Sequence, residues 1–181
     1  MGENAMRLAC LTVLVTVAGG PHALAAGTQV ADCETDPTFH GSGRADWRRS
    51  SEVGGPLGVR TNPLRSATMT PSGQFVTKMP VLIEGHRAVT LNVPPRLRHR
   101  VFLYYGTYRD RRGRRTTGFR RARGFSVVEF RPCAGKPRTI WPGGIRVRGR
   151  RPVRLTVTVE GRPDPIPLRL GRPIPYRPRR S

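Results

Sequence analysis

The chain has 181 residues, of which 33 are lysine or arginine and 11 are acidic, giving a formal net charge of +22. This length suits one domain and excludes two of ordinary size once an export signal is removed. The charge favours anionic partners and costs self-repulsion in the folded state. Only Lys78 and Lys136 are lysines; high-GC coding explains the preference for arginine, but it does not explain the shortage of acids.

The first 25 residues predict a secretory signal peptide. An arginine precedes an apolar run over residues 8–18, and Ala23 and Ala25 supply the small residues of a cleavage site. We expect cleavage after Ala25, with the bond after Ala26 as the alternative. The apolar run would span roughly 16 Å as a helix, about half of a hydrocarbon core, which argues against an uncleaved membrane anchor.

The exported part contains two cysteines, Cys33 and Cys133, which can form a single intramolecular disulfide. Closing a loop of about 100 residues would destabilise the unfolded chain by about 4 to 5 kcal/mol in the loop-entropy model. The alternative, two free thiols, is a liability outside the cell. The predicted localisation is therefore secreted, either extracellular or associated with the cell envelope.

Period-two alternation of apolar residues dominates the exported part and predicts a single all-β domain over residues 26–170. Residues 26–72 are partly loop, with one edge strand over 53–59. The other expected strands cover residues 75–84, 89–93, 100–105, 125–130, 145–148, 153–159 and 166–170. We predict an antiparallel sandwich of about seven strands and immunoglobulin-like size, with a small barrel as the alternative. The Pro/Arg-rich tail, residues 171–181, is expected to be disordered.

The densest basic segment runs from Arg109 to Arg123 and holds eight arginines against one acid, Asp110. Aromatic residues flank this segment, and aromatics interleaved with arginine can stack on sugars or bases. A solvated arginine-rich hairpin is the alternative, because a hairpin also needs aromatics simply to pack. The candidate ligand-binding residues are Arg111, Arg112, Arg114, Arg115, Arg120, Arg121 and Arg123. Export disfavours nucleic acid as the natural ligand and favours an anionic wall polymer or a membrane surface.

The sequence shows no pattern typical of a catalytic or metal centre. His40, His86 and His99 are widely separated and form no closely spaced ligand pair, so we predict no metal and no cofactor. No G-x-S-x-G elbow is present, and a disulfide-bonded cysteine is unavailable as a nucleophile. We therefore predict a non-enzymatic binding or structural module. The alternatives are an envelope hydrolase with carboxylates that converge only in the fold, and a protein-interaction or inhibitor domain.

The segment Trp141-Pro142-Gly143-Gly144 has two interpretations. A tryptophan on a Pro-Gly-Gly turn can form a sugar-stacking platform. A tryptophan that follows a cysteine-bearing strand more often fills the end of a core next to the disulfide. We favour the structural interpretation.

The order of the segments SVVEFRPC, TIWPGGIRVRG and PVRLTVTVEGR resembles a group of exported β-proteins of high-GC Gram-positive bacteria. These proteins share an F-x-x-C segment and a W-x-G-G turn, and the resemblance extends from Lys78 to Pro173. It implies two further cysteines in relatives, at the positions of Val153 and Ile174 here. Both cysteines are expected to be lost together if they are bonded to each other in the relatives, because loss of one alone would leave an exposed free thiol. The resemblance implies no activity and no catalytic residues.

Overall fold

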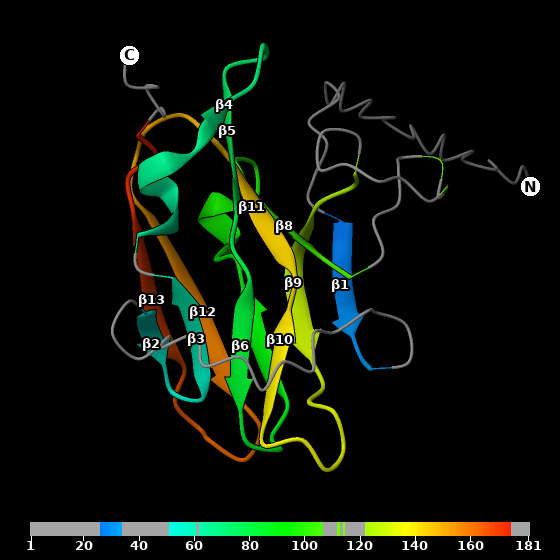
Figure 1. Cartoon of the computed structure of the whole chain (residues 1–181). Coiled ribbons are helices and arrows are strands. Elements are labelled where there is room, and N and C mark those ends of the chain that lie inside the picture. Colours follow the sequence, from blue (N-terminus) through cyan, green and yellow to red (C-terminus); the bar gives the residue numbers. More distant parts are fainter. Residues whose placement is uncertain are drawn as a thin grey trace, which may run out of the picture.

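The computed structural model describes residues 26–33, 51–60, 62–106, 112, 114 and 122–174. Within these ranges the chain forms thirteen strands and two short 3-10 helices, with no α-helix (Figure 1). The prediction of an all-β fold is therefore confirmed. The predicted signal peptide and the tail residues 175–181 lie outside the described residues.

The strands form two sheets. The larger sheet has the order β13-β12-β7-β9-β8-β11-β5-β4, with β1 attached to β9, and the smaller has the order β10-β6-β3-β2. The larger sheet contains β1 (Ala26–Ala31), β4 (Thr68–Met69), β5 (Gln74–Lys78), β7 (Val89–Asn92), β8 (Val101–Tyr105), β9 (Phe125–Phe130), β11 (Gly143–Arg148), β12 (Val153–Val159) and β13 (Ile166–Gly171). The smaller sheet contains β2 (Ser51–Gly54), β3 (Leu57–Arg60), β6 (Val81–Glu84) and β10 (Arg138–Trp141). The 3-10 helices are η2 (Pro63–Ser66) and η3 (Pro95–Leu97).

The alternation seen in the sequence places one face of each sheet on the core. In β12, Val153, Leu155 and Val157 are buried whereas Arg154 and Thr158 are exposed. Residues from both sheets form one continuous hydrophobic cluster. A half-buried antiparallel strand with one wet face is the structure that period-two patterning favours.

Two strands pass from one sheet to the other at the same corner. The predicted run over residues 75–84 is divided at Met79-Pro80 into β5 of the larger sheet and β6 of the smaller. The second crossing lies between β10 and β11, at Pro142. The amide of Met79 donates to the carbonyl of Gly143 at 2.9 Å, so the two crossings lie side by side. Proline lacks a ladder donor, which suits it to such a bend.

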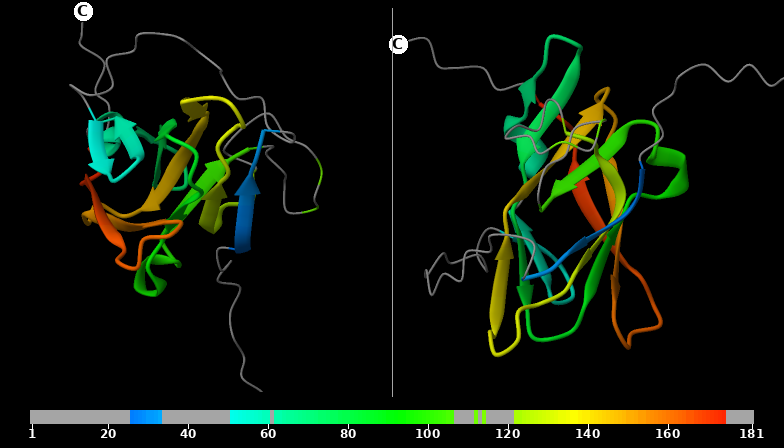
Figure 2. Two further views of the ribbon diagram at one scale, coloured as in Figure 1. Left: turned by 90° about the horizontal axis from the view of Figure 1, so that it is seen from below. Right: turned by 90° about the vertical axis from the view of Figure 1, so that its right-hand side faces the viewer.

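The sheets contain more strands than the alternating runs predict. Residues 53–59 form part of a hairpin, β2 and β3, because Gly55 adopts a left-handed conformation with φ of 68°. Strands β1, β4 and β10 were not predicted. Strand β1 pairs in parallel with β9, which lies between β7 and β8 in the strand order, whereas the other described pairings are antiparallel. Figure 2 shows β1, in blue, on the outside of the molecule.

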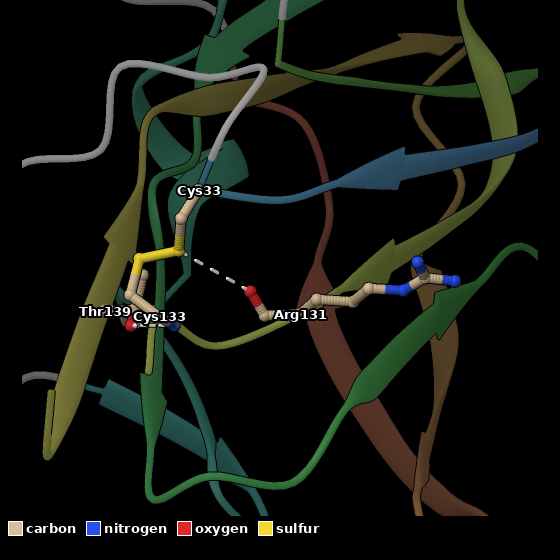
Figure 3. The surroundings of a disulfide bond; sticks show 4 residues. All are labelled: Cys33, Arg131, Cys133 and Thr139. Atoms are coloured by element: carbon tan, nitrogen blue, oxygen red, sulfur yellow. Dashed lines mark hydrogen bonds between the residues drawn. A yellow bond between two sulfur atoms is a disulfide. The ribbon is translucent and has the colours of Figure 1, made fainter. Parts of the chain in front are cut away.

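The predicted disulfide joins Cys33 to Cys133, and its Cα atoms are 5.6 Å apart. The bond lies just beyond the last residue pair of these strands, Ala31 with Phe130, so it ties the end of β1 to the end of β9 (Figure 3). The amide of Cys133 donates to Thr139 Oγ1 at 3.2 Å, and Thr139 is fully buried. The bond therefore anchors an edge strand to the interior.

Candidate functional site

Three of the seven predicted ligand-binding arginines lie within the described residues. Arg112, Arg114 and Arg123 are exposed. Arg111, Arg115, Arg120 and Arg121 lie outside the described residues.

The end of the predicted basic segment packs on the outer face of β8. Ala122 forms a small buried cluster with Phe102 and Tyr104. Gly124 is equally close, because a Cβ there would lie 2.5 Å from the Cβ of Phe102. Arg123, between them in the chain, is exposed to solvent.

Arginines of the neighbouring strand β11 stack over the same rings. The guanidinium carbon of Arg146 lies 5.2 Å from the ring centre of Phe102 and 5.0 Å from that of Tyr104. That of Arg148 lies 5.4 Å from Phe102. Both arginines point outward because the alternate residues, Ile145 and Val147, are fully buried. Such stacking holds a guanidinium in place by cation–π attraction.

A third arginine extends this arrangement beyond the strand. The guanidinium carbon of Arg150 lies 6.0 Å from the ring centre of Phe75 on β5. We call Arg146, Arg148 and Arg150 the arginine row. Sequence reasoning missed the row as a site, although the alternation in IRVRGR over residues 145–150 is a signal for outward arginines on a strand.

The row leads into an open pocket of about 710 Å³. Its walls come from two turns, one preceding β8 and one joining β11 to β12. The lining residues are His99, Arg100, Arg148, Gly149, Arg150 and Arg151. The pocket is thus built from basic residues and glycine.

Arg100 is the buried member of this pocket. It is 8% exposed, and its Nη2 donates to the backbone carbonyl of Arg151 at 2.7 Å. Its Nε has no hydrogen-bond partner. Burial first, and the charge of Arg151 second, lower the pKa of the Arg100 guanidinium below its usual value. Burial of a cation without a carboxylate is costly, so the environment of Arg100 is electrostatically incomplete.

The described carboxylates lie elsewhere. Glu129 pairs with Arg131, at 2.7 Å, and Glu84 pairs with Arg138, at 3.3 Å. Glu160, at the far end of β12 from the pocket, accepts the amide of Ala88 at 3.1 Å. The seven residues of β12 separate the two ends by roughly 20 Å at the usual rise of a strand. The end of the sandwich with the pocket is therefore the basic end.

The structural interpretation of Trp141 is confirmed. Its side chain is fully buried, and its ring centre lies 6.0 Å from that of Phe130. Position 143 requires glycine because a Cβ there would overlap the ring of Tyr105. The hydroxyl of Tyr105 in turn donates to the carbonyl of Met79 at 2.7 Å. The Trp-Pro-Gly-Gly segment forms the corner between the sheets rather than a sugar platform.

His86 and His99 lie in turns at opposite ends of the sandwich, and His40 lies outside the described residues. No three histidine, cysteine or acidic side chains gather among the described residues in a way that could hold a metal ion. In the part of the chain that the structure describes, no helix has the length and apolar character needed to cross a membrane.

Comparison with known proteins identifies no relative. The chain matches no protein-family model, and a search of curated proteins finds no similar sequence.

Proposed function

We propose that this protein is a secreted, strongly basic, non-enzymatic binding module of the cell envelope that contacts anionic polymers or surfaces. The observation that carries this proposal is the arginine row on the outer face of the larger sheet, where the guanidinium groups of Arg146 and Arg148 lie 5.0 to 5.4 Å from aromatic ring centres. Arginines held in this way lose less conformational freedom when they bind an anion.

Two further features support the proposal. The net charge of +22 attracts anionic polymers over a long range at low ionic strength. The disulfide between Cys33 and Cys133 fits an oxidising compartment outside the cytosol. The contacting residues would be the arginine row together with Arg111, Arg112, Arg114, Arg115, Arg120, Arg121 and Arg123.

The test is co-sedimentation of the oxidised protein with purified cell-wall material and with anionic vesicles across a salt series. A row variant replaces Arg146, Arg148 and Arg150 with glutamine. A segment variant replaces the seven sequence-predicted arginines in the same way. The matched control replaces Arg87, Lys136 and Arg162, which are exposed at the end of the sandwich opposite the pocket, and so removes the same charge as the row variant.

We expect binding that weakens steeply with salt. Each exposed charge contact contributes up to about 1 kcal/mol, so loss of three contacts should weaken binding about tenfold or more. The control should lose less than about threefold because it changes the net charge alone. No salt-dependent binding to either material would overturn the proposal. Equal losses in the row variant and the control would remove the row from it.

A further inference from the structure

The pocket at the β11–β12 turn contains a buried cation for which the described part of the chain provides no anion. Arg100 is 8% exposed, and its guanidinium donates to a neutral acceptor, the backbone carbonyl of Arg151. In the described residues no carboxylate pairs with it, and the like charge of Arg151 adds to burial in lowering its pKa. Burying a charge under these conditions is unfavourable unless another group compensates.

The other arginines of the pocket are held in position. Arg148 lies against Phe102 and Arg150 against Phe75. The amide of Arg148 donates to the carbonyl of Arg100 at 2.8 Å, which fixes the two turns against each other. The donors of this site are therefore arranged before any ligand arrives, and such preorganisation reduces the entropic cost of binding.

We propose that this pocket is a subsite for one phosphoryl group of a phosphodiester-linked polymer, with Arg100 at its base and Arg148 and Arg150 at its opening. This assignment rests on the proposed function and gives it a chemical class. Guanidinium groups from several directions suit a tetrahedral oxyanion with multiple acceptor oxygens, whereas a planar carboxylate is satisfied by a single fork. A pocket of about 710 Å³ also accommodates the groups that flank the phosphate.

A polymer suits this pocket better than a membrane surface does. Peripheral membrane proteins insert exposed apolar side chains beside their basic residues. Within the described residues, the exposed large apolar side chains are Met69 and Ile174, and neither lines the pocket. Arg100 lies below the exposed surface, where a flexible chain can reach it more readily than a packed headgroup layer.

The experiment measures binding of inorganic phosphate and dimethyl phosphate to the purified, oxidised protein by calorimetry and NMR titration at constant ionic strength. Acetate, which has a planar carboxylate, and sulfate, which is tetrahedral like phosphate, serve as competing anions. The variants are Arg100→Gln, Arg100→Lys and Arg150→Gln, and Arg87→Gln is the matched control. Poly(glycerol phosphate) and phosphatidylglycerol vesicles then separate the two sources of a phosphodiester.

We expect saturable binding of one phosphate per chain, with acetate at least about tenfold weaker. Arg100→Gln and Arg150→Gln should each weaken binding about tenfold or more, since a charge-assisted hydrogen bond is lost. Arg100→Lys should restore part of the affinity because it keeps the charge without the fork. Arg87→Gln should change affinity less than about twofold. Arg150 is exposed and tests the site even if the Arg100 variants fail to fold.

Three outcomes would overturn the assignment. The first is affinity that follows ionic strength alone and is equal for phosphate and acetate. The second is equal weakening by Arg87→Gln and Arg150→Gln. The third is vesicle binding that depends on Arg100 as strongly as polymer binding does. In the first two cases, the proposed function would still stand if wall binding depended on the arginine row. A different result, specific phosphate binding without any wall binding, would overturn the proposed function but not the phosphate site.

Discussion

The two faces of strands β8 and β11 use aromatic residues in different ways. On the inner face, Tyr105 packs edge-on against Phe130, with ring centres 4.9 Å apart, and fills the space above Gly143. On the outer face, Phe102 and Tyr104 are covered by Ala122 and by the guanidinium of Arg146. The inner rings are enclosed by other apolar groups, whereas the outer rings support cations.

This difference separates stability from binding within one pair of strands. Apolar burial dominates on the inner face, and its loss costs several kcal/mol per large side chain. The outer arginines contribute less to stability, because cation–π contacts at partly exposed sites are worth about 0.5 to 1 kcal/mol. Inner-face variants should therefore be less stable yet bind normally when folded. Outer-face variants should keep most of their stability and bind more weakly.

The largest expected effect on stability comes from the disulfide that ties the end of β1 to the end of β9. Replacing Cys33 and Cys133 together with serine should lower the free energy of unfolding by about 4 to 5 kcal/mol, because the bond spans a sequence separation of 100 residues. Urea denaturation of the oxidised protein and the variant measures the difference. A loss below about 1 kcal/mol would show that the unfolded chain is already restricted. Wall binding per folded molecule should be unchanged.

Trp141 gives the next effect. Trp141→Ala should cost about 3 to 5 kcal/mol, because the side chain is fully buried beside Phe130. Trp141→Phe should cost much less, under about 1.5 kcal/mol, because it also removes an indole N–H that has no hydrogen-bond partner. Thermal and urea unfolding distinguish the two variants. Equal losses in the two variants would mean that the lost side-chain volume does not determine the cost.

Gly143 tests the corner itself. Gly143→Ala should cost about 1 to 3 kcal/mol through overpacking, because the added Cβ meets both the Tyr105 ring and the carbonyl of Tyr104. Gly135→Ala is the control: a Cβ there meets nothing within 4 Å, and the cost comes from its φ of 67°. The informative readout is side-chain NMR of Tyr105, which should shift in the first variant and stay unchanged in the second.

The sequence predicted the alternating strands well because their burial repeats every two residues. Strands β9 and β12 have the predicted bounds. The pattern did not reveal β1, since its pairing with β9 is parallel and two of its residues, Gly27 and Thr28, are exposed. It also did not divide the run 75–84, because the bend at Met79-Pro80 depends on a second crossing 63 residues later, at Pro142.

The site was predicted only in its general character. Charge density identified the segment ending at Arg123. The packing of Ala122 and Gly124 against Phe102 is a tertiary contact that charge density does not reveal. Arg100 was not distinguishable from other arginines, since its burial results from the meeting of two turns. Composition reports how many arginines a chain has, whereas the fold determines which of them converge.

The smallest effect on stability should accompany a clear effect on binding. Arg146→Met keeps an unbranched side chain over Phe102 and Tyr104, and a sulfur–aromatic contact of about 0.3 to 1.5 kcal/mol replaces the cation–π attraction. The variant also removes a buried Nε that has no hydrogen-bond partner. We therefore expect the free energy of unfolding to change by less than about 1 kcal/mol.

Binding should respond differently to the same substitution. Loss of one fixed charge from the arginine row should weaken wall binding several-fold at low salt and make the remaining binding less sensitive to salt, because fewer charge contacts are formed. Arg154→Met on β12, an exposed arginine outside the row, is the matched control. Both variants are compared by co-sedimentation across the salt series and by urea denaturation. If Arg146→Met were destabilising and bound normally, the outer face would be part of the stability of the fold, and the separation between the two faces would be wrong.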